Sequence, residues 1–309
     1  MPEALLDQVR AAAARTAASA RFVRIDAARI EAYAASLPLE AAHAPSLDPR
    51  THYLGPPAAT LAYVVTLDAI NFGSGYFPKL RKRPGCSGYF TVAWSLKDAF
   101  EAHGPLSAAQ LQQLDQAACT ALFGQADTDA SIDELMGLFA QALRDLGAYL
   151  KRRFGGSFAE LVAAADGLAE RLVELLVEMP FYRDVGFLKR AQLTAADLVV
   201  AGVASLRDLD RLTIFADNLV PHVLRLDGVL EYDAGLVARI EREELIPAGS
   251  PEEAEIRACA LHAVELLAMA LRQRGEPVSA MQLDYVLWNR GQQPAYKARP
   301  RHRTRTVYY

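Results

Sequence analysis

The sequence contains little cysteine and no cysteine motif. Its 309 residues include only Cys86, Cys119 and Cys259, which are scattered and form no CxxC pair. Metal sites and disulfide frameworks depend on characteristic spacings. We therefore expect three reduced, mostly buried thiols in a cytoplasmic protein, with no metal-binding or nucleophilic role.

Long hydrophobic runs and a surplus of basic residues are also missing. No apolar stretch reaches the roughly 18 residues that a membrane span requires, so no membrane association is expected. Residues 1–23 lack a compact hydrophobic region with a cleavage site, and they predict a first helix instead of a targeting segment. The formal net charge of −4 argues against a general nucleic-acid binder, although it is compatible with a local basic patch.

Several common catalytic motifs are absent as well. The sequence has no P-loop, GxGxxG, GxSxG or HExxH motif. The closest approach to a metal motif is His262 with Glu265, a spacing that favours a hydrogen bond on one helix face. Nothing in the sequence requires a metal or an organic cofactor.

What the sequence does contain is a series of helix starts. The S-x-x-E/Q capping pattern occurs in SIDE, SFAE, SPEE and SAMQ, which begin at Ser131, Ser157, Ser250 and Ser279. Apolar residues at helical spacing follow each; Gly155 and Gly156 are expected to end the helix after Ser131, and Gly275 the helix after Ser250. Strand signals are few, at residues 63–67, 88–94 and the terminal TVYY. The fold class is mainly α: one compact helical domain over residues 1–309, or two intimate helical lobes, with a few short strands.

Polar residues interrupt an apolar run near residue 70, in an island that begins at His52. Asp68 and Asn71 would be costly to bury without partners. They cap the following loop, or they form an edge that recognises a planar heterocycle, with Phe72 stacking on its face. The glycine- and aromatic-rich stretch that follows, residues 72–90, contains the basic segment KLRKR and predicts a long ordered loop.

The segment RLTIFADNLVPHVLR, residues 211–225, looks helical but contains Pro221. Proline donates no backbone hydrogen bond, so we expect the helix to open near Val220 and to leave Asp217 on its open last turn. The simpler alternative is a surface aspartate, because Asp217 points away from the apolar stripe. Two interpretations also apply to Lys189, Arg190 and Gln192: they form a solvated helix face, or they belong to a binding site.

The C-terminal segment combines a capped helix with a basic tail. Asp284 and Trp288 lie on that helix, and the tail contains Lys297, Arg299, Arg301, His302, Arg303 and Arg305. Such a tail is either disordered and attracted to polyanions, or it folds back as a strand and supplies a phosphate clamp.

Taken together, these islands resemble the queuosine salvage family, the queuosine 5′-phosphate N-glycosylase/hydrolases. The resemblance rests on five segments in the family's order: LDAINFGSGYFP, FLKRAQL, LTIFADNLVPHVL, LDYVLWNRG and HRTRTVYY. It spans the chain from His52 to Tyr309. Asn218 and Leu219 depart from the usual ADYRVP pattern, whereas Asp217 and Pro221 keep it.

The resemblance implies hydrolysis of the N-glycosidic bond of queuosine 5′-monophosphate and release of queuine for tRNA modification. It also implies a mainly helical fold that is distantly similar to helix–hairpin–helix DNA glycosylases. The sequence has no clear glycosylase hairpin, because LDGV at residues 226–229 is at most a remnant. We therefore expect a small nucleotide as the partner and no stable nucleic-acid complex.

The implied reaction assigns roles to the islands. Asp217 is the expected catalytic carboxylate near C1′, as nucleophile or as general base. A 7-deazapurine has no N7, so its other edge must be recognised, and Asp68, Asn71 and Asp284 are candidates. The remaining substrate-binding candidates are His52, a stacking Phe72 or Trp288, Lys189 for the phosphate or the catalytic carboxylate, and the phosphate-binding Arg303 and Arg305.

A non-catalytic helical module that binds tRNA or nucleotides is the alternative, using the basic tail and the KLRKR loop. A tRNA binder would spread its cations over one face. An enzyme for a small substrate would gather them in one pocket beside carboxylates.

Overall fold

The computed structural model describes residues 3–42 and 45–309, and most of these are helical. The prediction of a mainly α fold is confirmed. The helices are α1 (Leu5–Ser19), α2 (Ile30–Ala35), α3 (Pro57–Ala69), α4 (Gly88–His103), α5 (Ala108–Gln113), α6 (Gln116–Leu122), α7 (Ala130–Phe154), α8 (Phe158–Ala163), α9 (Ala169–Leu176), α10 (Lys189–Val200), α11 (Val220–Leu226), α12 (Ala234–Glu241), α13 (Pro251–Gln273), α14 (Ala280–Gly291) and α15 (Pro294–Lys297). The strands are β1 (Val23–Ile25) and β2 (Leu230–Tyr232), which pair antiparallel with Val23 opposite Tyr232.

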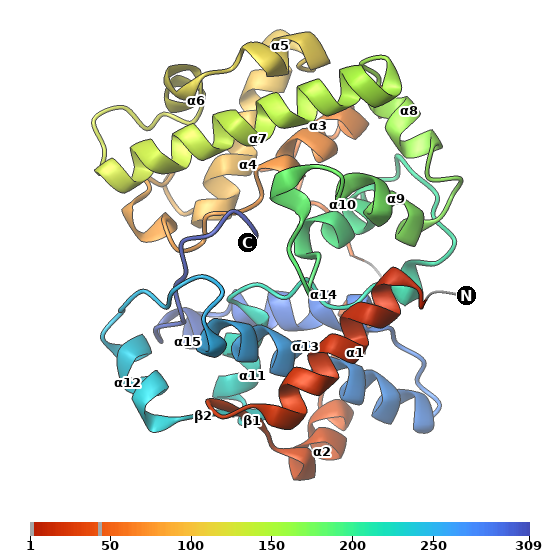
Figure 1. The fold of residues 1–309 in the computed structure, drawn as a ribbon, viewed down its shortest axis with the longest axis vertical. Coiled ribbons are helices and arrows are strands. Elements are labelled where there is room, and N and C mark those ends of the chain that lie inside the picture. The colour runs from red at the N-terminus through yellow and green to blue at the C-terminus, as the bar shows by residue number, and fades with distance from the viewer. Residues whose placement is uncertain (1–2, 43–44) are drawn as a thin grey trace.

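The helices form two groups (Figure 1). One contains α3 to α10, with the long helix α7 running across it next to α5 and α6; the other contains α1, α2, α11 to α15 and the β1–β2 pair. The last residues of the chain pass from the second group to the first. There the Gly73 N–H donates to the Tyr309 carbonyl over 2.9 Å. Buried apolar side chains from both groups form one continuous core.

Helix α7 shows how the apolar pattern produces the packing. Its stripe of Ile132, Leu135, Phe139 and Leu143 is fully buried, and burying each such side chain contributes about 1.5–3 kcal/mol. Gly147 allows α5 to approach closely, because a Cβ there would lie 2.5 Å from the Ala108 carbonyl oxygen. The helix ends where predicted, with Gly155 in the left-handed conformation.

The capping patterns located three of four helix starts. Ser157, Ser250 and Ser279 cap α8, α13 and α14 with their side chains. The prediction for Ser131 is wrong, because Asp129 caps α7 and accepts hydrogen bonds from both the backbone N–H and the hydroxyl of Ser131.

The predicted strands are wrong. Residues 63–67 lie inside α3 and residues 88–94 begin α4. The segment at 63–67 is buried on every side, with Val65 fully inaccessible. The periodicity of a short apolar run that is buried all round does not distinguish a helix from a strand. The terminal TVYY forms no strand, although nearby Arg303 makes an isolated bridge with Leu245.

The other predictions concern irregular segments, thiols and membrane spans. Residues 72–87 form an ordered loop with a short 3₁₀ turn at Phe77–Lys79, and helix α4 then starts at Gly88. Residues 227–229, in the LDGV segment, form the turn from α11 to β2. Cys119 and Cys259 are buried and all three cysteines are free. Among the described helices, none has the length and apolar character needed to span a membrane.

Candidate active site

Asp217 lies in an irregular segment, residues 212–219, that leads into α11. The prediction that a helix ends near Val220, just after Asp217, is wrong, because a helix begins there instead. Pro221 occupies the first turn of α11, where a missing N–H costs nothing. Oδ1 of Asp217 accepts from the backbone N–H groups of Leu219 (2.7 Å) and Val220 (3.2 Å). Oδ2 makes no hydrogen bond with the residues that the structure describes, so one carboxylate oxygen is fixed and the other is available.

Buried side chains hold the backbone of this segment. The Thr213 N–H donates to Gln192 Oε1 over 2.8 Å, and the Phe215 N–H donates to Asp284 Oδ1 over 2.9 Å. Nε of Arg257 donates to the Ala216 carbonyl over 2.9 Å. Because buried peptide groups must be hydrogen-bonded, these partners fix the backbone that carries Asp217.

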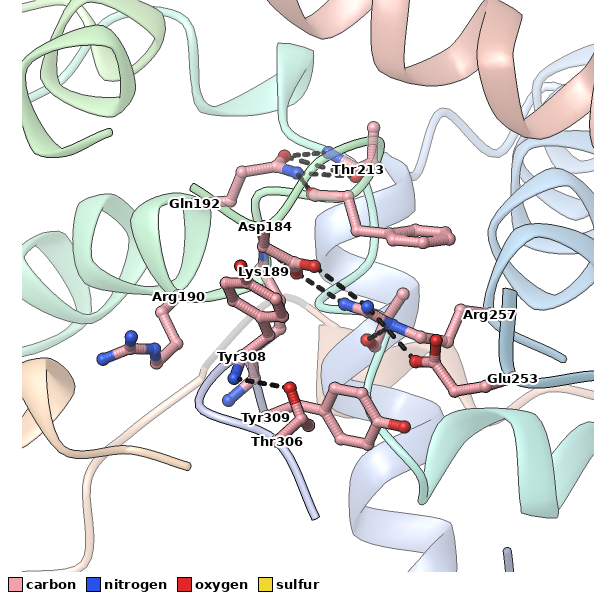
Figure 2. Close-up of polar contacts among 12 residues, drawn as sticks. Asp184, Lys189, Arg190, Gln192, Thr213, Glu253, Arg257, Thr306, Tyr308 and Tyr309 are labelled. Atoms are coloured by element: carbon pink, nitrogen blue, oxygen red, sulfur yellow. Dashed lines mark hydrogen bonds and ion pairs between the residues drawn. The ribbon is translucent and has the colours of Figure 1, made fainter. Parts of the chain in front are cut away.

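Arg257, Asp184 and Glu253, which we name the Arg257 cluster, connect this segment to α10 (Figure 2). Arg257 donates from Nη1 to Asp184 Oδ1 over 2.9 Å and from Nη2 to Asp184 Oδ2 over 2.5 Å. Asp184 Oδ2 also accepts from the backbone N–H of Lys189 over 3.2 Å. The residue before Lys189, Leu188, has a positive φ of 53°, a strained conformation of the kind found at functional sites. Through its bonds to Asp184 and to the Ala216 carbonyl, Arg257 therefore fixes the backbone at both Lys189 and Asp217.

Lys189 is buried among polar groups from α3 and the segment of Asp217. Its Nζ donates to the backbone carbonyl of Asn71 over 3.3 Å and to Asn71 Oδ1 over 3.4 Å. Burial lowers the pKa of Lys189, and the charges of Asp217 and Asp68 oppose that shift most strongly. Lys189 is therefore a cation on which the charges of both Asp217 and Asp68 act.

Asp68, Asp197, Asp217 and Asp284, which we name the acidic cluster, surround this lysine. Burial, followed by the charge of Asp217, raises the pKa of Asp284 to about 8. Burial also raises the pKa of Asp197 to about 7, with Lys189 opposing the shift. The pKa of Asp68 is raised well above its usual range by burial and then by Asp197. Asp68, Asp197 and Asp284 thus retain protons near neutral pH, and Asp284 can donate a hydrogen bond.

Aromatic side chains line the side of the acidic cluster formed by α4 and α14. The ring centroids of Tyr89 and Trp288 are 6.3 Å apart and those of Phe90 and Trp288 are 5.9 Å apart, both near-perpendicular. Tyr89, Phe90, Tyr285 and Trp288 are only half-buried. Partly exposed aromatic rings of this kind can contact a planar ligand or a cation.

His52 orients Tyr89. Nδ1 of His52 lies 3.1 Å from the Asp48 carbonyl oxygen, and Nε2 lies 2.9 Å from the Tyr89 hydroxyl. A carbonyl only accepts, so Nδ1 carries the proton and Nε2 accepts from Tyr89. Burial lowers the pKa of His52, which favours this neutral ring. The lone pairs of the Tyr89 oxygen then remain available to a ligand.

The structure brings most of the candidate residues from the sequence together. Asp68, Asn71, Lys189, Asp217 and Asp284 share one neighbourhood, and His52 and Trp288 border it through Tyr89.

Phe72, Arg303 and Arg305 lie elsewhere. The guanidinium of Arg190 covers Phe72 at 4.8 Å from the ring centroid, so Phe72 packs in the core. Arg303 pairs with Glu243 at 3.5 Å, and Arg305 lies 4.0 Å from Glu134.

Residues that the sequence analysis did not assign to the site also lie in this neighbourhood. Asp197 interrupts the apolar stretch of α10 as Asp68 interrupts α3, so the same criterion could have identified it. Tyr285 donates to Asp197 Oδ1 over 3.3 Å. Arg301 is half-buried and close enough to Asp217 for that charge to oppose the lowering of its pKa by burial. With the residues that the structure describes, Arg301 forms neither an ion pair nor a side-chain hydrogen bond.

Comparison with known proteins relates the whole arrangement to a family. The model of the queuosine salvage protein family matches residues 51–309. A protein of Sphaerobacter thermophilus is 37% identical over 282 residues, which cover 86% of each chain. Relatives from Mus musculus (30% identical, 85% of each chain) and Dictyostelium discoideum (32% identical, 81% of this chain and 78% of the relative) are also similar. All three relatives are named queuosine 5′-phosphate N-glycosylase/hydrolase.

Proposed function

Because the chain belongs to the queuosine salvage protein family, we propose that it hydrolyses the N-glycosidic bond of queuosine 5′-monophosphate and releases queuine. The observation that supports this reaction best is the pairing of Asp217 with Asp284 beside Lys189. A carboxylate with a free oxygen and a protonated carboxyl are the groups that glycosidic cleavage requires. The small nucleotide is the partner, and no stable nucleic-acid complex is part of the proposal.

Asp217 acts on the sugar in this mechanism. Cleavage of the C–N bond develops positive charge at C1′, and the free Oδ2 of Asp217 stabilises that charge. Its fixed Oδ1 keeps the carboxylate oriented without reorganisation during the reaction. Oδ2 either activates water or attacks C1′; inversion of the anomeric carbon in a methanol-trapping experiment indicates the first route and retention the second.

Asp284 acts on the leaving base. Its pKa of about 8 keeps it protonated at neutral pH, and its Oδ1 is occupied by the Phe215 N–H. The other oxygen is thus able to donate a hydrogen bond to the base. A 7-deazapurine offers no N7 to an acid, so the donor must address another edge of the ring. Trp288 provides the face for stacking.

Lys189 and Arg301 supply positive charge. Lys189 neutralises the carboxylates around it and orients Asp217. Arg301 is the arginine assigned to the 5′-phosphate, because its neighbours in the basic tail, Arg299, Arg303 and Arg305, are directed at Glu241, Glu243 and Glu134. These glutamate partners also count against the basic tail as a tRNA-binding surface, which would require exposed, unpaired cations on one face.

The free cysteines support the cytoplasmic location expected from the sequence.

Incubation with queuosine 5′-monophosphate, with free queuine measured by mass spectrometry, tests the proposed function. We expect release by the wild type and a loss of at least about 10³-fold in kcat/KM for Asp217→Asn, roughly 4 kcal/mol of transition-state stabilisation. Asp210→Asn, an exposed aspartate on the same connection between helices, is the matched control and should retain activity. Binding of the nucleotide without release of base by the wild type would favour the binding-module alternative.

A further inference from the structure

We propose that Tyr309 is a positioning residue, which aligns Lys189 in the helix group of α3 to α10 with Asp217 in the other helix group. It acts through the residues that it holds and does not touch the substrate. Tyr309 belongs to the segment of residues 302–309, which passes from the second group to the first (Figure 1). The proposal rests on the proposed function, because it concerns the geometry in which that reaction occurs.

The active site is divided between the two helix groups. Asn71 follows α3 and Lys189 begins α10, in the first group, whereas Asp217 precedes α11 and Asp284 lies on α14, in the second. A small rotation of one group against the other would change the separation of Lys189 and Asp217. Displacements of about 1 Å can lower a reaction rate about 10²-fold. Contacts that join the groups therefore bear directly on the reaction.

One end of the 302–309 segment is attached to the second group. The backbone N–H of Ile246 donates to the Arg303 carbonyl over 2.8 Å. Nδ2 of Asn218 donates to the His302 carbonyl over 3.4 Å, and both of these residues are buried. Because Asn218 directly follows Asp217, the segment is held beside the catalytic carboxylate.

The other end of the segment is attached to the loop after α3, in the first group. The Gly73 N–H donates to the Tyr309 carbonyl over 2.9 Å. Gly73 is close in sequence to Asn71, which accepts the hydrogen bonds of the site's lysine. At Gly75 the two segments approach so closely that a Cβ would overlap the Thr304 carbonyl. Tyr309 therefore fixes the backbone that carries Asn71.

The side chain of Tyr309 contacts the Arg257 cluster (Figure 2). The guanidinium of Arg257 lies 4.6 Å from the ring centroid of Tyr309 and 3.9 Å from that of Phe187. Tyr309 is only 3% exposed, yet its ring lies outside the continuous apolar core of the described residues. The ring thus shields the ion pair of Arg257 with Asp184 from water, which strengthens that pair.

Tyr309 consequently contacts both supports of the site. Its backbone holds the loop of the first group that carries Asn71, and its ring covers the arginine of α13 that fixes the backbone at Lys189 and Asp217. Loss of the ring should let the two groups move relative to each other, and the chemical step should then slow.

Single-turnover release of queuine from queuosine 5′-monophosphate, with the protein in saturating excess, tests the proposal. The rate constant under these conditions does not depend on the fraction of folded protein, so a purely stabilising role would leave it unchanged. We expect Tyr309→Ala to lower it by roughly 10- to 100-fold and Tyr309→Phe, which keeps the ring over Arg257, to stay within about threefold of the wild type. An unchanged rate constant in Tyr309→Ala would overturn the proposal.

Tyr33→Ala is the matched control. Tyr33 is also buried and its ring also contacts an arginine, Arg290 at 5.7 Å, but both residues belong to the second group. This variant should be less stable than the wild type and should keep a rate constant within about threefold of it. A loss equal to that of Tyr309→Ala would show that any buried tyrosine has the same effect and would overturn the proposal.

A second measurement does not depend on catalysis. Spin labels at Lys151→Cys on α7 and Glu241→Cys on α12, both exposed positions, report the distance between the groups. The half-buried Cys86 is replaced by serine in this protein. We expect the distance distribution to broaden in Tyr309→Ala and in Gly75→Ala, and an unchanged distribution in both would overturn the proposal. Broadening without release of queuine by the wild type would refute the proposed function alone.

Discussion

The Arg257 cluster and the acidic cluster are both buried and charged, yet they are built differently. Arg257 is bonded to Asp184, Glu253 and the Ala216 carbonyl. Its guanidinium also lies 3.9 Å from the ring centroid of Phe187 and 4.6 Å from that of Tyr309. In the acidic cluster, Asp68 Oδ2 has no partner among the described residues, and the carboxyls of Asp197 and Asp284 retain protons near neutral pH.

The pKa shifts express the same contrast. Burial alone would lower the pKa of Arg257, but Asp184 and Glu253 outweigh it and the pKa is raised. Burial prevails at Lys189, whose pKa is lowered. A fully partnered cluster fixes the backbone, whereas an under-partnered one leaves hydrogen-bonding capacity and charge for a ligand.

Removal of the arginine from the Arg257 cluster should have the largest effect on stability. Arg257→Met leaves Asp184 and Glu253 buried without their cation, so we expect a loss of about 3–5 kcal/mol in the free energy of unfolding. Denaturant unfolding measures it. Arg242→Met, which removes an exposed pair with Glu244, should change stability by less than about 0.5 kcal/mol. Similar stability of Arg257→Met and wild type would show that the cluster does not hold the fold.

In the acidic cluster, substitution should cost activity instead of stability. Asp284→Asn keeps the size and the acceptor for the Phe215 N–H but loses the acidic proton. We expect kcat to fall by about 10²–10³-fold with unfolding close to that of the wild type at neutral pH. Single-turnover release of queuine measures the chemical step. Unchanged kcat would remove Asp284 from the mechanism.

The pH dependence of the free energy of unfolding should also distinguish the acidic cluster from the Arg257 cluster. Because the pKa of Asp284 in the folded protein is about 8, its contribution to stability is complete below its unfolded pKa, near 4, and is lost as the pH rises through 8. Between these limits the wild type should lose up to roughly 5 kcal/mol relative to Asp284→Asn, because four pKa units correspond to about 1.4 kcal/mol each.

Activity should follow the same proton. Since the proposed mechanism uses the acid form of Asp284, kcat for the wild type should fall about tenfold per pH unit above 8. Asp284→Asn should lack this limb of the pH–rate profile. An identical limb in the variant would assign the proton to another group.

The smallest of these effects concerns the phosphate end. Arg301→Gln should raise KM for the 5′-monophosphate by roughly 10- to 100-fold and leave hydrolysis of the nucleoside nearly unchanged. Arg305→Gln, at a side chain that is 37% exposed and 4.0 Å from Glu134, is the matched control and should have little effect. The reverse result would restore Arg305 as the phosphate ligand.

Much of the site was visible in the sequence because local rules identify misplaced polar residues. Asp68 and Asn71 stood out because they interrupt an apolar run and Lys189 because it opens one, whereas Asp284 became a candidate through the family resemblance; the structure gathers them with Asp217. Phe72 and Arg305 were chosen by residue type alone. The sequence does not show whether another side chain already covers an aromatic ring or a guanidinium. In the structure, Arg190 covers the ring of Phe72.

The sequence by itself determined the helical class, the starts of α8, α13 and α14, the end of α7 and the islands of unusual polar residues, because caps, glycine stops and apolar periodicity act over one or two turns. Only the tertiary structure decided that Pro221 begins a helix, that residues 63–67 are helical and that Arg301 is the tail arginine beside Asp217. Burial and partners from distant segments settle such choices, since the energy of a charge depends on what surrounds it in space.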